Sequence, residues 1–538
     1  MRLLRGSILL ITTALLFRCS PDFAGGPGSG SETTNGITVA VVYPDGTPGA
    51  GALVRLRQAK YLYDDAVTSK KIDTVTNSSG TILFSGLESG EYTIEINDTR
   101  GWAVLISCKV EPDDPDSVLP VNTLRRTSSF SGVVDWDTQQ ASVSVMVYGL
   151  ERTAEVDPVT GEFTLADMPE GAYMLRLSSN ENPEIRTDIR GIIVSDSLQQ
   201  KPLSIDLSWP LIQKIVLNTT ENGADVHETV TDFPAVIRLS SSNFDFSRVT
   251  ESNPAIRFLN QHGDTLPYQI ELWDSPGATA LLWVKIDTVK GNDLTTITIL
   301  AGKSDITGKS DGAAVFDTGN GFQAVWHLQS GGKGPVFDAT VNSFDGTPQG
   351  TGLSGVECII GKGLRFADSA YIKIPNSAEG ALSYPEEGTF TLSAWVYTDK
   401  IDTLYQEIIS KSNFQYGLQM NRYSQWNLYV YKNLTGWTCT DDSAAAGSWY
   451  YLSGVRSGKN QFLYVNGVLA DSNPVIKVDS IRIDYSHNVM IGRRSDIADR
   501  YFSGMMDEVR ISDRARSASW IKLCYQNQRK DQKFVIIK

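Results

Sequence analysis

Three oxygen-bearing side chains lie close together on a stretch of the chain, 337–347, that also contains a glycine: Asp338, Asn342 and Asp345. Ca²⁺ takes roughly six to eight oxygen ligands from carboxylates, amides and backbone carbonyls, and a loop of this composition can bring such groups together. A strand-like run near the end of the chain, which begins with Asp507 and Glu508, offers more carboxylates. Both stretches are therefore candidates for a cation site.

The same residues also have a purely structural explanation. Asp338 and Asn342 could cap a turn through hydrogen bonds from their side chains to nearby backbone groups. Asp507 could pair with an arginine such as Arg510 or Arg514, which follow it closely. The sequence leaves both explanations open.

A cluster of aromatic residues between 423 and 451 could bind a sugar, because aromatic rings can stack on the apolar faces of sugar rings. Its members are Tyr423, Trp426, Tyr429, Tyr431, Trp437, Trp449, Tyr450 and Tyr451. In a strand over 425–431, the face that carries Trp426 is otherwise apolar and predicts core, while the opposite face carries the two tyrosines. Core packing explains most of the cluster, and the predicted ligand contacts are Tyr429, Tyr431 and Trp437.

Catalytic motifs are missing from the sequence. Glycoside hydrolysis needs two carboxylates that face each other across a cleft, whereas the pairs Glu386–Glu387 and Asp441–Asp442 are adjacent residues in turn-like surroundings. The four histidines show no metal-binding spacing, and neither a Gly-x-Ser-x-Gly elbow nor a phosphate-binding loop occurs. We therefore expect no enzyme activity, although a triad of residues far apart in the sequence stays open.

The length and charge of the chain narrow its class. Its 538 residues suggest three or four domains, and 41% hydrophobic with 20% charged residues is a globular composition. The net charge of −14 would repel a polyanion, so nucleic acid is not an expected partner. Apart from Cys19, the four cysteines match no disulfide scaffold, and isolated buried thiols with at most one disulfide are expected.

The N-terminus has the pattern of an export signal. Two arginines precede an apolar run from Ile8 to Phe17, which is too short to span a bilayer, and a spacer rich in Gly, Ser and Pro follows. Cys19 directly after this run resembles the lipobox of bacterial lipoproteins, which implies a signal peptide over 1–18 and a lipidated Cys19 on a tether over 19–35. Arg18 stands where the lipobox has a small residue, so cleavage near 24–26 and secretion form the alternative.

Two stretches of the N-terminal half repeat each other at an offset of 81 residues. Gly80, Gly90 and Tyr92 recur in the second copy as Gly161, Gly171 and Tyr173, between apolar strand residues. The pattern predicts two copies of one β-sandwich of the immunoglobulin or transthyretin kind, over 36–125 and 126–208. Both resemble carboxypeptidase-regulatory-like domains, which implies a spacer role.

The segment 209–305 contains six strand-like runs separated by turn residues, beginning with 232–240, and predicts a further β-sandwich. The order of its sequence motifs, among them Leu-Pro-Tyr-Gln-Ile-Glu-Leu-Trp at 266–273, resembles that of a bacterial module known as domain of unknown function 2341. This module commonly precedes a LamG-like domain, and the resemblance implies no activity.

The last part, 319–538, contains the sequence motifs of a LamG-like domain in their usual order. They include Ala-Val-Trp-His-Leu at 324–328, the loop 337–347, a central strand at 390–397, an Asn-Gly hairpin at 462–469 and Gly-Met-Met-Asp-Glu-Val-Arg-Ile at 504–511. Together they resemble LamG-like domains, which are jelly rolls of the concanavalin A-like lectin and glucanase kind. The Glu-x-Asp-x-Glu string of glucanases with this fold is absent.

The resemblance joins the two candidate cation stretches, because the N-terminal loop and the last strand lie close together in LamG-like domains. It therefore implies a Ca²⁺ site with Asp338, Asn342, Asp345 and Asp507 as ligands. Strand alternation places Glu508 on the side opposite Asp507. Val509 and Ile511 are expected in the core, and 510–516 is expected to be a polar exit.

The sequence thus predicts an all-β protein of four sandwich domains. A lipid on Cys19 is expected to hold it in the cell envelope, at the outer membrane or the cell surface. The predicted function is non-catalytic recognition of a polysaccharide or a surface protein by the C-terminal domain. The alternatives are a structural component of the envelope without a ligand and, less expected, a polysaccharide-active enzyme.

Overall fold

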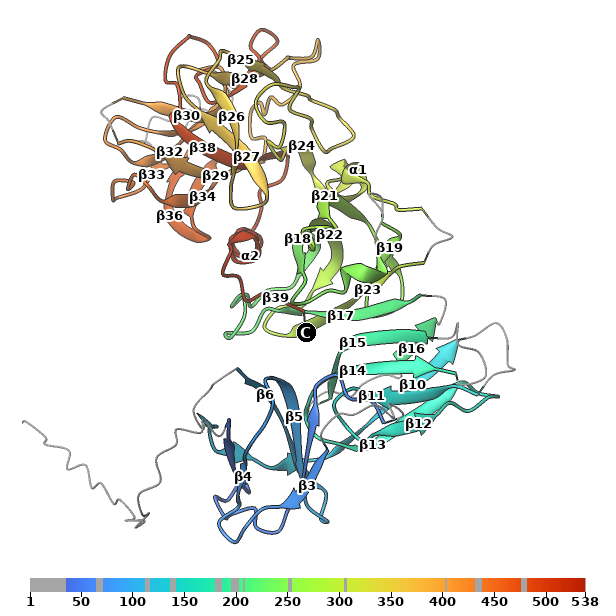
Figure 1. The fold of residues 1–538 in the computed structure, drawn as a ribbon. Helices are drawn as coiled ribbons and strands as arrows, with labels where there is room; N and C mark the ends of the chain where they lie inside the picture. Colours follow the sequence, from blue (N-terminus) through green and yellow to red (C-terminus); the bar gives the residue numbers. More distant parts are fainter. Residues whose placement is uncertain are drawn as a thin grey trace, which may run out of the picture.

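The computed structural model describes twelve ranges of the chain (Figure 1): 35–63, 71–111, 117–135, 142–179, 186–194, 203–206, 209–249, 254–303, 307–401, 404–430, 438–475 and 481–537. The predicted signal peptide and Cys19 lie outside these ranges. Within them, no helix is both long and apolar enough to cross a lipid bilayer. Strands make up nearly all of the regular secondary structure of the described residues, so the protein is all-β, as predicted.

The first sandwich consists of two sheets around one apolar core. One sheet has the order β4-β1-β7, with β8 also on β1, and the other has the order β3-β2-β5-β6-β9. The strands are β1 (Ile37–Val42), β2 (Leu53–Gln58), β3 (Ile72–Val75), β4 (Thr81–Phe84), β5 (Gly90–Asn97), β6 (Trp102–Val110), β7 (Ser117–Val118), β8 (Asn122–Thr123) and β9 (Arg125–Arg126).

The second sandwich repeats this arrangement, with β13-β10-β16 in one sheet and β12-β11-β14-β15 at the start of the other. Its strands are β10 (Ser128–Asp135), β11 (Ser144–Val147), β12 (Thr153–Glu155), β13 (Glu162–Met168), β14 (Gly171–Ser178), β15 (Arg186–Val194) and β16 (Leu203–Asp206). The parallel pairing of β1 with β7 in the first sandwich corresponds to that of β10 with β16 here.

The residues that revealed the repeat have the same role in both copies. Gly80 and Gly161 both have a φ of +72°, and a Cβ atom would lie 2.5 Å from the carbonyl oxygen of Val41 in one case and 2.4 Å from that of Val134 in the other. Tyr92 and Tyr173 each donate a hydrogen bond to the carbonyl four residues earlier. The predicted repeat is therefore present in the structure.

The third module follows without a break in the sheet. Its first strand pairs in parallel with β15 of the second sandwich, through 188–190 and 211–213, so that one nine-stranded sheet runs through both domains. The elements are β17 (Leu211–Asn218), β18 (Val230–Ser240), η1 (Phe246–Arg248), β19 (Ile256–Leu259), β20 (Thr265–Leu266), β21 (Tyr268–Asp274), β22 (Thr279–Val289), β23 (Leu294–Ala301), α1 (Gly312–Val315) and η2 (Thr318–Asn320).

The jelly roll consists of two facing sheets, β26-β27-β38-β29-β34-β35-β36 with β24 on β38, and β25-β28-β37-β30-β31-β32-β33. The bounds of the first sheet are β24 (Phe322–Trp326), β26 (Leu353–Glu357), β27 (Lys362–Phe366), β29 (Phe390–Thr398), β34 (Trp449–Ser457), β35 (Asn460–Val465), β36 (Val468–Pro474) and β38 (Gly504–Ser512). Those of the second are β25 (Thr347–Gln349), β28 (Tyr371–Ile374), β30 (Gln406–Lys411), β31 (Tyr416–Met420), β32 (Trp426–Val430), β33 (Thr438–Cys439) and β37 (Val489–Ile491).

Two local predictions for the jelly roll are confirmed. Val509 and Ile511 are fully buried in the core between its sheets. Asn466 and Gly467 join β35 to β36 and have φ values of +51° and +79°, the two positive values that a type I′ turn requires.

The end of the chain returns to the third module (Figure 1). Helix α2 (Ala518–Gln528) lies against β18, and β39 (Val535–Ile537) pairs antiparallel with β17. The side-chain amide of Asn527 continues the sheet at β18, because it accepts from the Val236 N–H at 2.7 Å and donates to the Val236 carbonyl at 3.0 Å. Residues 518–537 of the predicted domain 319–538 therefore pack on the third module.

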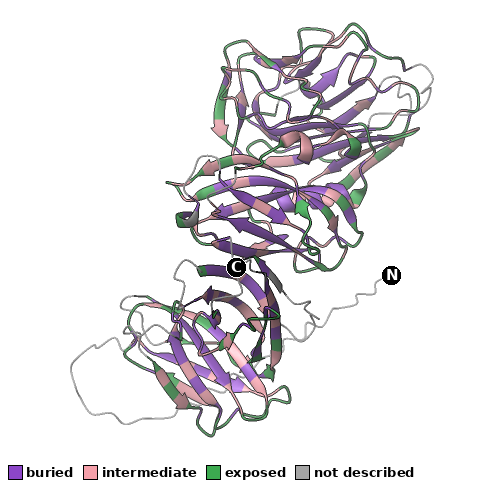
Figure 2. Ribbon diagram, turned by 90° about the vertical axis from the view of Figure 1, so that its right-hand side faces the viewer, coloured by how far each residue is buried: buried purple, intermediate pink, exposed green. Residues whose placement is uncertain are grey.

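Helix α2 also joins the third module to the jelly roll. Trp395 of β29 donates to Gln528 Oε1 at 2.7 Å and stacks on Tyr525, and it lies in the same apolar cluster as Trp520 and Phe233. Buried residues consequently continue through the strands of both units (Figure 2). We treat 209–537 as one folding unit.

Candidate functional site

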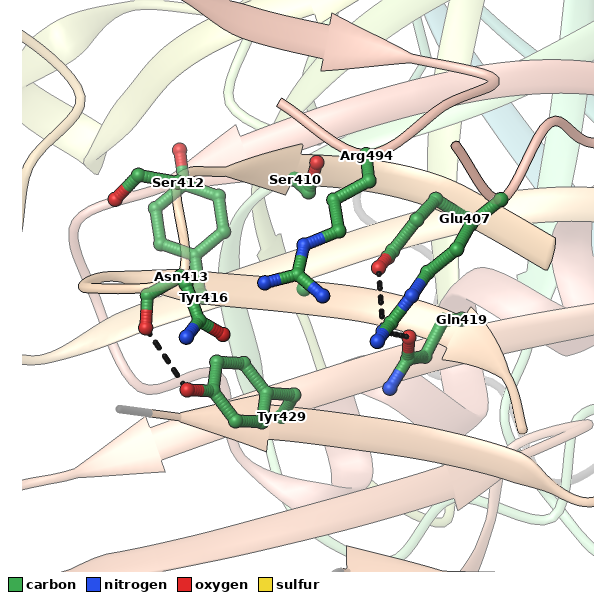
Figure 3. Close-up of a pocket in the computed structure, with 10 residues that line it drawn as sticks. Glu407, Ser410, Ser412, Asn413, Tyr416, Gln419, Tyr429 and Arg494 are labelled. Atoms are coloured by element: carbon green, nitrogen blue, oxygen red, sulfur yellow. Dashed lines mark hydrogen bonds and ion pairs between the residues drawn. The ribbon is translucent and has the colours of Figure 1, made fainter. Parts of the chain in front are cut away.

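A pocket of about 280 Å³ lies on β30, β31 and β32, on the side of this sheet opposite the jelly-roll core (Figure 3). Its lining is mostly polar, and the tyrosine ring outside the core is that of Tyr429, because the Tyr416 ring is buried in the jelly-roll core. The lining residues are Glu407, Ser410, Ser412, Asn413, Tyr416, Gly417, Gln419, Tyr429, Arg494 and Arg500.

Strand alternation determines which side chains of β31 and β32 face the pocket and which face the core. In β32, Trp426, Leu428 and Val430 are buried in the core, as predicted, while Tyr429 lines the pocket. In the same way, Leu418 of β31 points into the core and Gln419 lines the pocket. Tyr429 is thus placed where a ligand could touch it, whereas Tyr431 and Trp437 lie outside the described residues.

The carboxyl group of Glu407 forms the floor of the pocket. Its side chain is 5% exposed, and Oε1 accepts from Arg500 Nη1 at 3.4 Å, while Oε2 has no hydrogen-bond donor among the described residues. Gly417 makes room for this oxygen, because a Cβ atom there would lie 3.0 Å from Oε2. Burial raises the pKa of Glu407 to about 8, although Arg500 and Arg494 oppose the shift, so the group is largely protonated at neutral pH.

Two arginines flank this carboxyl group. Arg500 donates to Gln419 Oε1 at 2.9 Å, and its guanidinium lies 4.1 Å from the centre of the Tyr405 ring. Arg494 is held by Asp496 through two hydrogen bonds of 2.5 and 3.0 Å from Nε and Nη2, and its guanidinium points into the pocket between Tyr429 and Glu407 (Figure 3). Both cations are therefore fixed in orientation before any ligand binds.

The predicted calcium loop is a tightly bonded turn. The carboxylate of Asp338 accepts four hydrogen bonds of 2.8–2.9 Å, from the backbone N–H groups of Val325, Thr340 and Phe344 and from the Thr340 hydroxyl. Asp345 accepts from the Asp338 N–H at 2.8 Å. The structure therefore brings these two residues together in the contacts that the turn-capping alternative describes.

The other two predicted ligands have contacts of their own. The Asn342 amide donates to the Gln323 carbonyl at 2.9 Å. Asp507 is fully buried in β38, where Oδ2 accepts from the Ile360 N–H at 2.8 Å and Oδ1 has no donor among the described residues. Within the described chain, Asp507 forms no group of three acidic, histidine or cysteine ligands with the residues of the loop.

Chelation of calcium tests this site directly. Because the carboxylate oxygens of Asp338 are taken by protein donors, we expect EGTA to leave the melting temperature of the full chain unchanged in differential scanning calorimetry. Excess Mg²⁺ with EGTA is the control for ionic strength. A fall of several degrees that added Ca²⁺ reverses would show that the metal prediction is right.

Glu508 is where strand alternation fails. It has a φ of +54°, and Glu508 and Val509 together face the single residue Ala394 of β29, which is a β-bulge. The extra residue places Glu508 on the same side of β38 as Asp507 and Arg510, away from the jelly-roll core. The prediction that Glu508 and Asp507 point to opposite sides is therefore wrong. The expected polar exit at 510–516 is also wrong for Arg510 and Arg516, which are 4% and 9% exposed.

The bulge builds a charge cluster between the jelly roll and the third module. Glu508 accepts from Arg510 at 2.6 Å and lies 2.6 Å from His327 Nδ1, and His327 stacks on Trp283 of β22. Trp283 in turn donates to Glu271 of β21 at 2.6 Å. Ligand atoms of Glu271, His327 and Glu508 lie within 4.8 Å of one another, so these three residues have the types and spacing that a metal could use.

The carboxyl groups of this cluster differ in charge. Burial raises the pKa of Glu271 and of Asp507, and the charge of Glu508 raises both further. Burial also opposes the charge of Glu508, but His327 and Arg510 outweigh it and hold its pKa below the ordinary value. Glu508 is thus the carboxyl group of the cluster that carries a negative charge. Its hydrogen bonds with His327 and Arg510 balance this charge without a metal.

Sequence reasoning missed most of the residues in both sites. Glu407, Arg494 and Arg500 come from separate elements and form no motif, and Glu271 and His327 are brought to Glu508 only by the packing of two domains. The one local signal was Glu407 itself, a carboxylate within an otherwise strand-like run at 406–411.

No disulfide joins the four cysteines that the structure describes. Cys358 and Cys524 are buried free thiols, as expected, while Cys108 and Cys439 are partly buried.

The family comparisons match two parts of the chain. The model of the Concanavalin A-like lectin/glucanases superfamily matches residues 366–522. The model of a domain of unknown function (DUF2341) matches residues 252–329, which begins and ends later than the predicted 209–305 and includes β24. No curated protein matches this chain.

Several solved structures are similar to part of the chain. Domain 4 of AbnA, a GH43 extracellular arabinanase from Geobacillus stearothermophilus in complex with arabinotriose, is 18% identical, with 38% of this chain and 98% of that chain covered and a TM-score of 0.31. The binding domain of Paraclostridial Mosquitocidal Protein 1 is 14% identical, with 39% and 53% covered and a TM-score of 0.31. The botulinum neurotoxin serotype D binding domain is 13% identical, with 39% and 52% covered and a TM-score of 0.30.

This chain thus spans about half the length of the two toxin domains. The two facing sheets lie in the part of the chain that the concanavalin A-like model matches. The chain therefore carries a concanavalin A-like domain, and a DUF2341 segment precedes it.

Proposed function

We propose that the protein binds a glycan in the pocket on β30, β31 and β32. The observation that carries the proposal is the pocket itself, in which a tyrosine ring and several fixed polar groups face one small cavity. Sugars present both apolar ring faces and hydroxyl groups, and such a lining can contact both. The concanavalin A-like fold of the domain supports the same class of ligand.

Binding is favoured over hydrolysis by the acidic groups present. Glu407 is the single carboxyl group among the described residues that line the pocket, whereas glycoside hydrolysis uses two. Asp496, the nearby acid, is taken up by its two hydrogen bonds with Arg494. The acid pair Glu386–Glu387 lies exposed on a turn, with side chains 73% and 58% exposed.

The proposal is tested with the full chain on an array of plant, algal and bacterial polysaccharides. Tyr429→Ala should weaken binding to the polysaccharides that the natural protein binds by about two- to thirteenfold, because stacking of an aromatic ring contributes roughly 0.5–1.5 kcal/mol. Affinity electrophoresis measures the change.

Lys459→Ala is the matched control, since Lys459 is an exposed residue of the turn between β34 and β35 in the other sheet and pairs with Glu387. It should bind like the natural protein, and both variants should keep the natural melting temperature. Equal binding by Tyr429→Ala would place the glycan elsewhere. If the natural protein binds none of the polysaccharides but captures a defined surface protein, the alternative, a protein partner, would be favoured.

A further inference from the structure

The pocket offers many more hydrogen-bond donors than acceptors. Arginine has five N–H groups and no acceptor, and two arginines line this small cavity. The carbonyl oxygen of Gln419, an acceptor in the lining, is already occupied by Arg500, and the Gln419 amide donates to Asn427 at 2.6 Å. A ligand that fills the pocket must therefore bring oxygen acceptors.

The charges in the pocket point the same way. Arg500 and Arg494 are two cations, while Asp496 is the neighbouring acid that the arginines leave ionised. Arg494 uses Nε and Nη2 for Asp496, so Nη1 is its remaining group toward the cavity. When Glu407 is protonated, one unit of positive charge is thus uncompensated in the pocket, in a protein whose net charge is −14.

Glu407 completes this arrangement as a neutral acid. Its Oε2 atom is buried without a hydrogen-bond partner among the described residues, and a protonated carboxyl group can donate from that position. An ionised Glu407 would cancel the excess positive charge and repel an anion. The buried environment of the group favours the neutral form.

Resting on the proposed glycan site, we propose that the pocket selects an anionic sugar, and that Arg494, Arg500 and Glu407 hold the carboxylate of a uronic acid residue. The cavity of about 280 Å³ lies at the lower end of the volumes that take small ligands, so it holds one such sugar residue rather than a long segment of the polymer.

The test compares each acidic polysaccharide with its own neutral form. Polygalacturonate, alginate and hyaluronate are measured with the full chain beside the same polymers after reduction of their carboxyl groups. We expect at least one acidic polymer to bind about tenfold or more tightly than its reduced form, which is the effect of one charged hydrogen bond. Because the protein repels polyanions overall, a general attraction of charges would not produce this result.

Two variants assign the effect to the pocket. Arg494→Gln should lose about tenfold or more in affinity for the acidic polymer, whereas Lys459→Gln, which removes a cation from the other sheet, should not. Binding by the natural protein should fall as the pH rises through about 8, while Glu407→Gln should keep its affinity at pH 9 because its amide stays neutral.

The outcomes separate the two proposals. Neutral polymers that bind as well as acidic ones would overturn the selectivity and leave the glycan site intact. Absence of binding to every polysaccharide would overturn the glycan site itself. A pH profile shared by the natural protein and Glu407→Gln would remove Glu407 from the mechanism.

The stability of Glu407→Gln gives an independent check. In the natural protein the folded pKa of Glu407 lies above the unfolded one, so the group contributes stability below the unfolded pKa that is lost as the pH rises toward 8. Glu407→Gln should therefore melt at a higher temperature than the natural protein at pH 9 and at a similar temperature at pH 4.

Discussion

Replacing Arg510 with methionine lowers the free energy of unfolding of the unit 209–537 by about 3–5 kcal/mol. Arg510 is 4% exposed, and it binds Glu508 through two hydrogen bonds of 3.1 and 2.6 Å while its guanidinium covers the Trp283 ring at 4.5 Å. Methionine keeps much of the apolar stem but leaves Glu508 as a buried charge with His327 as its remaining partner. Urea unfolding followed by tryptophan fluorescence measures the loss.

Two further variants show whether charge is the cause. Adding Glu508→Gln to Arg510→Met should restore part of the stability, because it removes the unpaired charge. Arg125→Met removes an arginine from the exposed pair with Glu170, where the side chains are 68% and 37% exposed, and should cost about 1 kcal/mol or less. A loss below 1 kcal/mol for Arg510→Met would mean that the cluster does not stabilise the junction.

Ending the chain at Ser517 should prevent the third module from folding. The deleted part carries Trp520, Ile521, Leu523 and Phe534, all buried in the core that the module shares with the jelly roll. Each side chain of this kind contributes roughly 1.5–3 kcal/mol, so the four together approach the whole stability of a typical domain, about 5–15 kcal/mol. Calorimetry of the truncated chain should show the transitions of the first two sandwiches and lose that of 209–537.

A shorter deletion separates the helix from the strand. A chain that ends at Arg529 keeps α2 and loses β39, and it should fold with reduced stability because β18 stays covered. A chain ending at Ser517 with a natural calorimetric profile would show that the jelly roll and the third module fold without α2.

Local patterns were enough to predict the parts of the fold that depend on local constraints. Gly80 and Gly161 could be matched because a close backbone contact excludes any side chain at both positions. The two faces of β32 followed from alternation, since Trp426 and Leu428 fill a core on one side.

The remaining features depend on packing between elements far apart in the sequence. Nothing near Glu508 marks the bulge, because its positive φ is a strained conformation that the surrounding strands impose. Helix α2 contains apolar residues, but nothing near them indicates that they pack on a sheet formed some three hundred residues earlier, as the contact of Asn527 with Val236 shows. The pocket likewise needs Arg494 and Arg500 from a loop before β38 to meet Glu407 of β30.

The pairing of β39 with β17 also sets the order in which the protein can be completed. Synthesis produces β17 long before β39, and the whole jelly roll is made in between. Until α2 and β39 leave the ribosome, part of β17 and the outer edge of β18 remain open strand edges, which other chains can pair with. A chain whose synthesis stops before β39 therefore exposes an aggregation-prone strand edge that a chain containing β39 covers.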